Sequence, residues 1–158
     1  MPAKIIYLVC SLCFMCPPHP IRSAEYVRIL LADDHLSFQD FVQDLLEPAF
    51  EIIGKVQSGR ALLEAVSNLK PDVIVTGIEM PILNGLDALW DRTNSGCHAK
   101  VIVLTIDSDL DFVRSALAAG AFGFVAKHRA AIDLIPAIQA VLAGDFFVSP
   151  QDEVRIDL

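Results

Sequence analysis

The sequence predicts a doubly wound α/β domain, with a five-stranded parallel sheet and helices on both of its faces. Five short, nearly continuous apolar runs indicate strands that are covered on both faces. Segments with apolar residues at three- and four-residue steps alternate with these runs, and this alternation is typical of a parallel sheet with crossover helices. The 158 residues suit a single domain.

The first half of the chain shows the alternation clearly. Residues 27–32 form an apolar run, which predicts the first strand. Apolar residues then recur with helical spacing over 36–46, and Pro48 closes that helix. Residues 52–56 predict the second strand, and Ser58 is a candidate N-cap of the second helix.

The second half continues in the same order. Further strands are expected at 72–77, 101–105 and 122–125, and further helices at 86–90, 110–117 and 132–142. Gly120 and Gly144 are placed to end the last two helices, because glycine readily adopts the left-handed conformation that often follows a helix.

The regular pattern occupies only part of the chain. We expect residues 27–144 to form the domain, and 145–158 to form a C-terminal tail without an output domain. Residues 1–26 are expected to be a leader outside the fold. Lys4 and the apolar run 5–16 have features of a signal peptide, but no convincing cleavage site follows. A wrongly chosen start codon or a non-native leader accounts for this segment equally well.

Composition excludes several functions. The net charge of -8 repels the phosphate backbone of nucleic acids, so we expect no direct DNA binding. No stretch reaches the roughly 18 apolar residues of a spanning helix, which argues against an integral membrane protein.

The cysteines indicate a reducing compartment. Cys10, Cys13 and Cys16 cluster near the N-terminus while Cys97 stands apart, which is not the spacing of a disulfide framework. The C-x-x-C-x-x-C-P run has no nearby fourth ligand for an iron–sulfur cluster. We therefore expect a cytoplasmic protein.

Polar residues gather where the predicted strands end. These are Asp33 and Asp34 after the first strand, Gly77 at the end of the third, Thr105 at the end of the fourth and Lys127 after the fifth. In parallel sheets, the functional groups lie beyond the carboxyl ends of the strands. An acidic pair, a hydroxyl and an ammonium group are therefore expected on one edge.

Four segments resemble the receiver domains of response regulators: residues 31–35, 80–86, 103–105 and 120–127. The motif Ala-Asp-Asp-His and the closing residues 143–150 are typical of the subgroup that is joined to a LuxR-type helix-turn-helix. The resemblance covers about residues 27–150. It implies the flavodoxin-like receiver fold and a role in two-component phosphorelay signalling.

The resemblance also implies a role for each strand-end residue. In the family, a histidine kinase phosphorylates an aspartate at the end of the third strand, where this chain has Gly77. The roles implied for the other positions are Mg²⁺ binding for Asp33, Asp34 and the backbone carbonyl of Glu79, phosphoryl binding for Thr105 and Lys127, and an aromatic switch for Phe124.

Gly77 cannot accept a phosphoryl group, because glycine has no side chain. The loss of this carboxylate also predicts weak Mg²⁺ binding, since Mg²⁺ relies on one or two carboxylates plus phosphate oxygens. Asp72 is no substitute, because it lies at the other end of the same strand, roughly 16 Å away. Glu79 is the remaining candidate, and its side chain is expected to point to solvent.

Simpler structural roles stand beside these. With glycine at position 77, the preferred role of Lys127 is that of a counter-ion of the acidic pair. Phe124 serves equally as a core aromatic. His35, His98 and His128 are expected at the surface without catalytic roles.

The function predicted is a phosphorylation-incompetent pseudo-receiver that is not an enzyme. It would act by protein contact, as a homodimer or on histidine kinases and regulator proteins. The alternatives are a fragment of a phosphorylation-dependent transcriptional regulator, or the product of a decayed gene.

Overall fold

The computed structural model describes residues 26–78, 98–106 and 110–150. Several predicted features lie outside these ranges: the leader up to residue 25, Glu79, the motif at 80–86, the helix at 86–90 and the tail from residue 151. The other three motif segments lie within the described residues. The sheet and its helices are formed by residues in these ranges.

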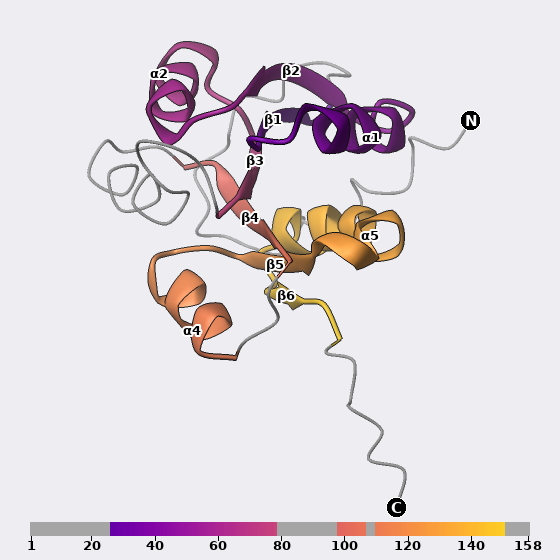
Figure 1. Ribbon diagram of the computed structural model, residues 1–158, viewed down its shortest axis with the longest axis vertical. Coiled ribbons are helices and arrows are strands. Elements are labelled where there is room, and N and C mark those ends of the chain that lie inside the picture. The colour runs from indigo at the N-terminus through magenta and orange to yellow at the C-terminus, as the bar shows by residue number, and fades with distance from the viewer. Residues whose placement is uncertain (1–25, 79–97, 107–109, 151–158) are drawn as a thin grey trace, which may run out of the picture.

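The centre of the molecule is a parallel sheet with the strand order β2-β1-β3-β4-β5-β6 (Figure 1). From β1, the chain adds β2 on one side and then β3, β4 and β5 in turn on the other side. This is the doubly wound arrangement that the sequence predicts. The strands are β1 (Arg28–Ala32), β2 (Glu51–Val56), β3 (Val73–Gly77), β4 (Lys100–Thr105), β5 (Gly123–Ala126) and β6 (Phe147–Val148).

Helices cover both faces of the sheet. Their bounds are α1 (Leu36–Leu46), α2 (Gly59–Leu69), α4 (Leu110–Ala118) and α5 (Ala130–Leu142), with a short 3-10 helix, η1 (Lys127–Arg129), between β5 and α5. Buried side chains of α1 and α5 pack with one set of strand residues, and those of α2 and α4 pack with the opposite set. Figure 1 shows the same division, with α1 and α5 on one side of the sheet and α2 and α4 on the other. No helix in the described ranges is long and apolar enough to cross a membrane.

The predicted parallel sheet is confirmed, and the described residues add a short sixth strand to the five that were expected. Residues 145–150, assigned to a tail, contain β6, which pairs in parallel with β5 and places Phe147 beside Gly123. Two residues carry no detectable periodicity, so the sequence pattern could not show this strand. Gly144 adopts φ +88 after α5, and this left-handed conformation redirects the chain towards β5.

Strand register brings the carboxyl ends of the strands to one edge. Ala32 of β1 is paired with Thr76 of β3, the neighbour of Gly77. On the other side of β3, Gly77 is paired with Leu104 of β4, and Thr105 is paired with Ala126 of β5. The polar residues that follow these positions are therefore close in space.

The predicted cap of the second helix is confirmed. Ser58 has an extended backbone, and its Oγ accepts a hydrogen bond from the backbone N–H of Ala61 at 3.2 Å. This satisfies one of the N–H groups that the first turn of a helix leaves without a partner.

Replacing this cap should weaken the domain. We expect Ser58→Ala to lower the free energy of unfolding by about 1 kcal/mol, because the Ala61 N–H loses its acceptor. The control is Ser67→Ala in the same helix, where an exposed Oγ donates to the carbonyl oxygen of Leu63 and caps nothing. Urea unfolding should show a loss for Ser58→Ala and little change for Ser67→Ala; equal losses would contradict the assignment of the cap.

Candidate functional site

The candidate site lies at the carboxyl edge of the sheet and is centred on Asp33. This residue directly follows β1 and is only 3 % exposed. Its backbone N–H donates to the carbonyl oxygen of Val56 at 3.1 Å, which fixes the turn after β1 against β2. Its Oδ1 accepts a hydrogen bond from the backbone N–H of His35 at 2.9 Å. The carboxylate is thus held in a defined orientation below the surface.

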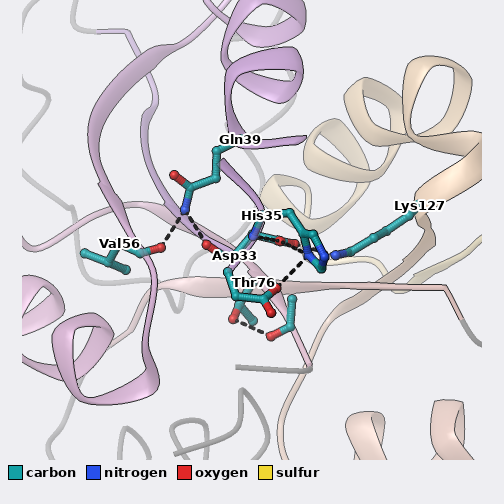
Figure 2. Close-up of polar contacts among 8 residues, drawn as sticks. Asp33, His35, Gln39, Val56, Thr76 and Lys127 are labelled. Carbon is teal, nitrogen blue, oxygen red and sulfur yellow. Dashed lines mark hydrogen bonds and ion pairs between the residues drawn. The ribbon is translucent and has the colours of Figure 1, made fainter. Parts of the chain in front are cut away.

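Lys127 is the charged partner of Asp33. Its Nζ lies 2.6 Å from Asp33 Oδ2, and its side chain is 15 % exposed (Figure 2). The same ammonium group lies 4.9 Å from the ring centroid of Phe38, where the face of an aromatic ring attracts a cation. Lys127 is therefore the counter-ion of Asp33. Loss of either partner of such a buried pair would leave an uncompensated charge, at a cost of about 3–5 kcal/mol.

The ion pair passes over the end of β3. Asp33 follows β1 and Lys127 follows β5, and β3 and β4 lie between these two strands in the sheet. Neighbouring strands are about 4.8 Å apart, so only a long side chain can bridge this separation. A lysine side chain is long enough for this. The residue at the end of β3, which lies between the two groups, must leave space for them to meet.

Gly77 leaves that path open. A Cβ atom at this position would lie 2.8 Å from Asp33 Oδ2 and 3.3 Å from Asp33 Cγ. The first distance is shorter than van der Waals contact allows, so the carboxylate of Asp33 occupies the space that a side chain at residue 77 would need. Any other residue here would force Asp33 to move.

Gln39 supports Asp33 from α1, and the sequence analysis missed it. The amide nitrogen of Gln39 donates to the carbonyl oxygen of Asp33 at 2.8 Å and to that of Val56 at 2.6 Å (Figure 2). Gln39 is 2 % exposed and lies in line with the buried residues Val42 and Leu46 of α1. A polar residue within the apolar stripe of a helix was the available signal.

His35 also lies closer to the acidic pair than expected. Its Nδ1 is 2.8 Å from Asp34 Oδ1 and 3.3 Å from Asp33 Oδ1, although the side chain is 58 % exposed. One ligand atom of each of these three residues lies within 4.8 Å of the others. The carboxylates suit a hard cation such as Mg²⁺, whereas an imidazole is a ligand for transition metals. Lys127 already holds one oxygen of Asp33, so the donor set fits Mg²⁺ only in part.

The other predicted residues that the structure describes, Thr105 and Phe124, lie in β4 and β5. Thr105 ends β4 and is 7 % exposed. Thr76, the residue before Gly77, directs its hydroxyl to the carbonyl oxygen of Gly77 at 3.0 Å. Phe124 is 2 % exposed within the core that α2 and α4 cover. Its proposed switching role stays a prediction, as do the phosphoryl-binding roles of Thr105 and Lys127.

A very small cavity borders Asp33 among the described residues. The cavity, of about 10 Å³, is lined by residues that include Asp33, Phe38 and Gln39. This volume is close to the minimum for a single water molecule.

Comparisons with curated proteins show relatives of one kind. The transcriptional regulatory protein DegU of Brevibacillus brevis is 35 % identical over 127 residues, which cover 79 % of this chain and 54 % of DegU. The transcription regulator BvgA of Bordetella pertussis is 35 % identical over 120 residues, which cover 75 % of this chain and 57 % of BvgA. The chain thus spans a little over half the length of these relatives.

Solved structures agree with the sequence relatives. A LuxR-family two-component response regulator from Aurantimonas superposes with a TM-score of 0.76 at 26 % identity, covering 80 % of this chain and 91 % of that one. The signal receiver domain of the response regulator NarL from Mycobacterium tuberculosis gives 0.73 at 25 % identity, covering 76 % and 98 %. The family model for the response regulator receiver domain matches residues 29–139. The chain therefore belongs to the receiver domains of response regulators.

Proposed function

We propose that the chain is a pseudo-receiver, which does not accept a phosphoryl group and acts through protein contacts. The observation that carries this proposal is the arrangement at Gly77, where the carboxylate of Asp33 fills the space of a residue-77 side chain and is paired with Lys127. In the family, that position is expected to carry the nucleophile.

Asp33 is a poor replacement for the missing acceptor. Phosphoryl transfer needs an oxygen that can approach the phosphorus atom in line with the leaving group. Asp33 Oδ2 is fully buried and lies against the ammonium of Lys127. Its negative charge is compensated by this ammonium group and is not open to a phosphodonor.

The proposed mode of action is binding. Receiver domains interact with histidine kinases and with other regulators, and we propose these proteins or a second copy of the chain as partners. The proposed location is the cytoplasm, because the four cysteines lack the spacing of a disulfide framework.

A second function is favoured by the relatives. DegU and BvgA are named as transcription regulators, and this chain spans 54 % and 57 % of their lengths. The second candidate is therefore the receiver part of a phosphorylation-dependent transcriptional regulator. Glu79 or another acid would then have to accept the phosphoryl group.

Phosphorylation separates these two candidates. We expect the wild-type chain to gain no phosphoryl mass with acetyl phosphate and Mg²⁺, whereas Gly77→Asp gains one, because the new carboxylate supplies the nucleophile. The new side chain must push Asp33 aside, which also frees Lys127 to meet the phosphoryl oxygens. Intact-protein mass spectrometry measures the outcome.

Gly77→Asn is the matched control, since it has nearly the same shape and displaces Asp33 equally but has no carboxylate. It should remain unmodified. A labile phosphoryl group on the wild-type chain would show that another acid is the acceptor, and it would overturn the pseudo-receiver proposal.

Magnesium binding should be limited by Lys127. We propose that Asp33 and Asp34 bind Mg²⁺ weakly because the ammonium of Lys127 competes for Asp33 Oδ2. Lys127→Met should then tighten Mg²⁺ binding roughly tenfold, since the cation would fill the place of the lost charge. Isothermal titration with MgCl₂ measures the affinity.

The control for this substitution is Lys55→Met. Lys55 is also paired with an aspartate, Asp40, at 2.7 Å, but on the surface between β2 and α1. Its loss should leave the Mg²⁺ affinity unchanged. Unchanged affinity in Lys127→Met would mean that Lys127 does not compete with the metal.

Direct DNA binding is not expected. The net charge of -8 opposes association with a polyanion. A fluorescence anisotropy titration with a labelled duplex at moderate salt should show no saturable binding. Saturable binding that weakens steeply as salt is added would contradict this expectation, since that is the signature of counterion release.

A further inference from the structure

The segment after α5 is hydrogen-bonded back to β5, next to the Lys127 loop. We call residues 145–150 the exit segment. The backbone N–H of Phe147 donates to the carbonyl oxygen of Phe122 at 3.0 Å, and that of Ser149 donates to that of Phe124 at 2.8 Å. Two residues of strand pairing are a weak anchor by themselves. Side chains therefore contribute to holding this segment.

Ser149 supplies the side-chain anchor. Its Oγ accepts a hydrogen bond from the backbone N–H of Ala126 at 3.2 Å and donates to Asp133 Oδ2 at 2.8 Å. Ser149 is 5 % exposed and Asp133 is 6 % exposed. Arg129 donates from Nε to the same Asp133 oxygen at 2.7 Å. The hydrogen bond from Arg129, against the cost of burial and with help from Ser149, holds the pKa of Asp133 below its usual range.

Both ends of η1 are thereby fixed by ion pairs. Lys127, its first residue, is bound to Asp33 at 2.6 Å, and Arg129, its last residue, is bound to Asp133 at 2.7 Å. Ala126, whose N–H meets Ser149, immediately precedes Lys127. A shift of the Lys127 backbone would therefore act on the hydrogen bond between Ala126 and Ser149 and on the ion pair of Arg129.

Residue 77 controls the position of the Asp33 carboxylate, which is the first group in this series of contacts. Because a Cβ at Gly77 would approach Asp33 Oδ2 to 2.8 Å, a side chain there must shift the carboxylate that holds Lys127. From Asp33, whose carboxylate fills the space of a residue-77 side chain, the contacts run through Lys127, η1 and Asp133 to Ser149.

We propose that these contacts couple residue 77 to the exit segment. Glycine at 77 lets Asp33 hold Lys127, and η1 transmits this restraint to Ser149, so the exit segment is fixed on β5 without a phosphoryl group or a metal ion. The inference rests on the proposed function in one respect. Residue 77 has no side chain that competes with Asp33 for Lys127, so the ion pair and the exit segment keep one arrangement.

Amide hydrogen exchange in the full chain, followed by NMR, tests the coupling. In Gly77→Ala, exchange of the Ala126 and Ser149 N–H groups should accelerate about tenfold or more relative to the N–H of Leu62 in α2, which reports overall stability; tenfold corresponds to about 1.4 kcal/mol. The matched control is Gly54→Ala in β2, where a Cβ would meet only side-chain ends, both at 3.2 Å. This control should change the three amides by the same factor.

Lys127→Met is the second variant, and it decides the question if Gly77→Ala does not fold. It leaves residue 77 unchanged and should accelerate the same two amides. The double variant should add little to the larger single effect, because both changes break one contact. The coupling would be overturned if, in either folded variant, the exchange rates of the Ala126 and Ser149 N–H groups changed by the same factor as that of Leu62.

The exchange experiment contains no phosphodonor, so its result is independent of the phosphorylation test. A phosphorylated wild-type chain with coupled amides would refute the pseudo-receiver proposal alone. An unmodified chain with uncoupled amides would refute the coupling alone.

Discussion

The ion pair between Asp33 and Lys127 ties together the carboxyl edge of the sheet. The two residues follow β1 and β5, which are not neighbours, and their side chains meet over β3 at 2.6 Å. A buried carboxylate is costly without a compensating charge, so the position of the loop after β5 and that of the turn after β1 depend on each other. Gln39 adds a second restraint by donating to the backbone oxygen of Asp33 in this turn and to that of Val56 at the end of β2.

Gly77 affects both the shape and the chemistry of this edge. Glycine has no side chain that could act as a nucleophile, and it leaves the volume into which the Asp33 carboxylate fits. These two effects have one cause, so restoring a carboxylate here also rearranges its neighbours. The site is therefore a repacked arrangement of charges around the missing side chain, and the ion pair is part of that packing.

The sequence predicted the features that depend on burial along a strand. Continuous apolar runs such as the one before Asp33 are typical of strands covered on both faces, so five strands and the edge carrying Asp33, Thr105 and Lys127 could be expected. Contacts between side chains could not be inferred in this way. The bonds of Gln39, the approach of His35 to Asp34 and the strand β6 depend on distances across the fold, which no local pattern encodes.

The sixth strand also changes how the sheet meets other molecules. Without β6, the border of the sheet would be β5, all four residues of which are buried. An uncovered strand of this kind presents free N–H and C=O groups that the strand of another chain can pair with, which is a route to aggregation. β6 shortens the border to two residues, of which Val148 is 40 % exposed, and a short border gives little length for such pairing. The exit segment thus protects the chain from intermolecular sheet extension.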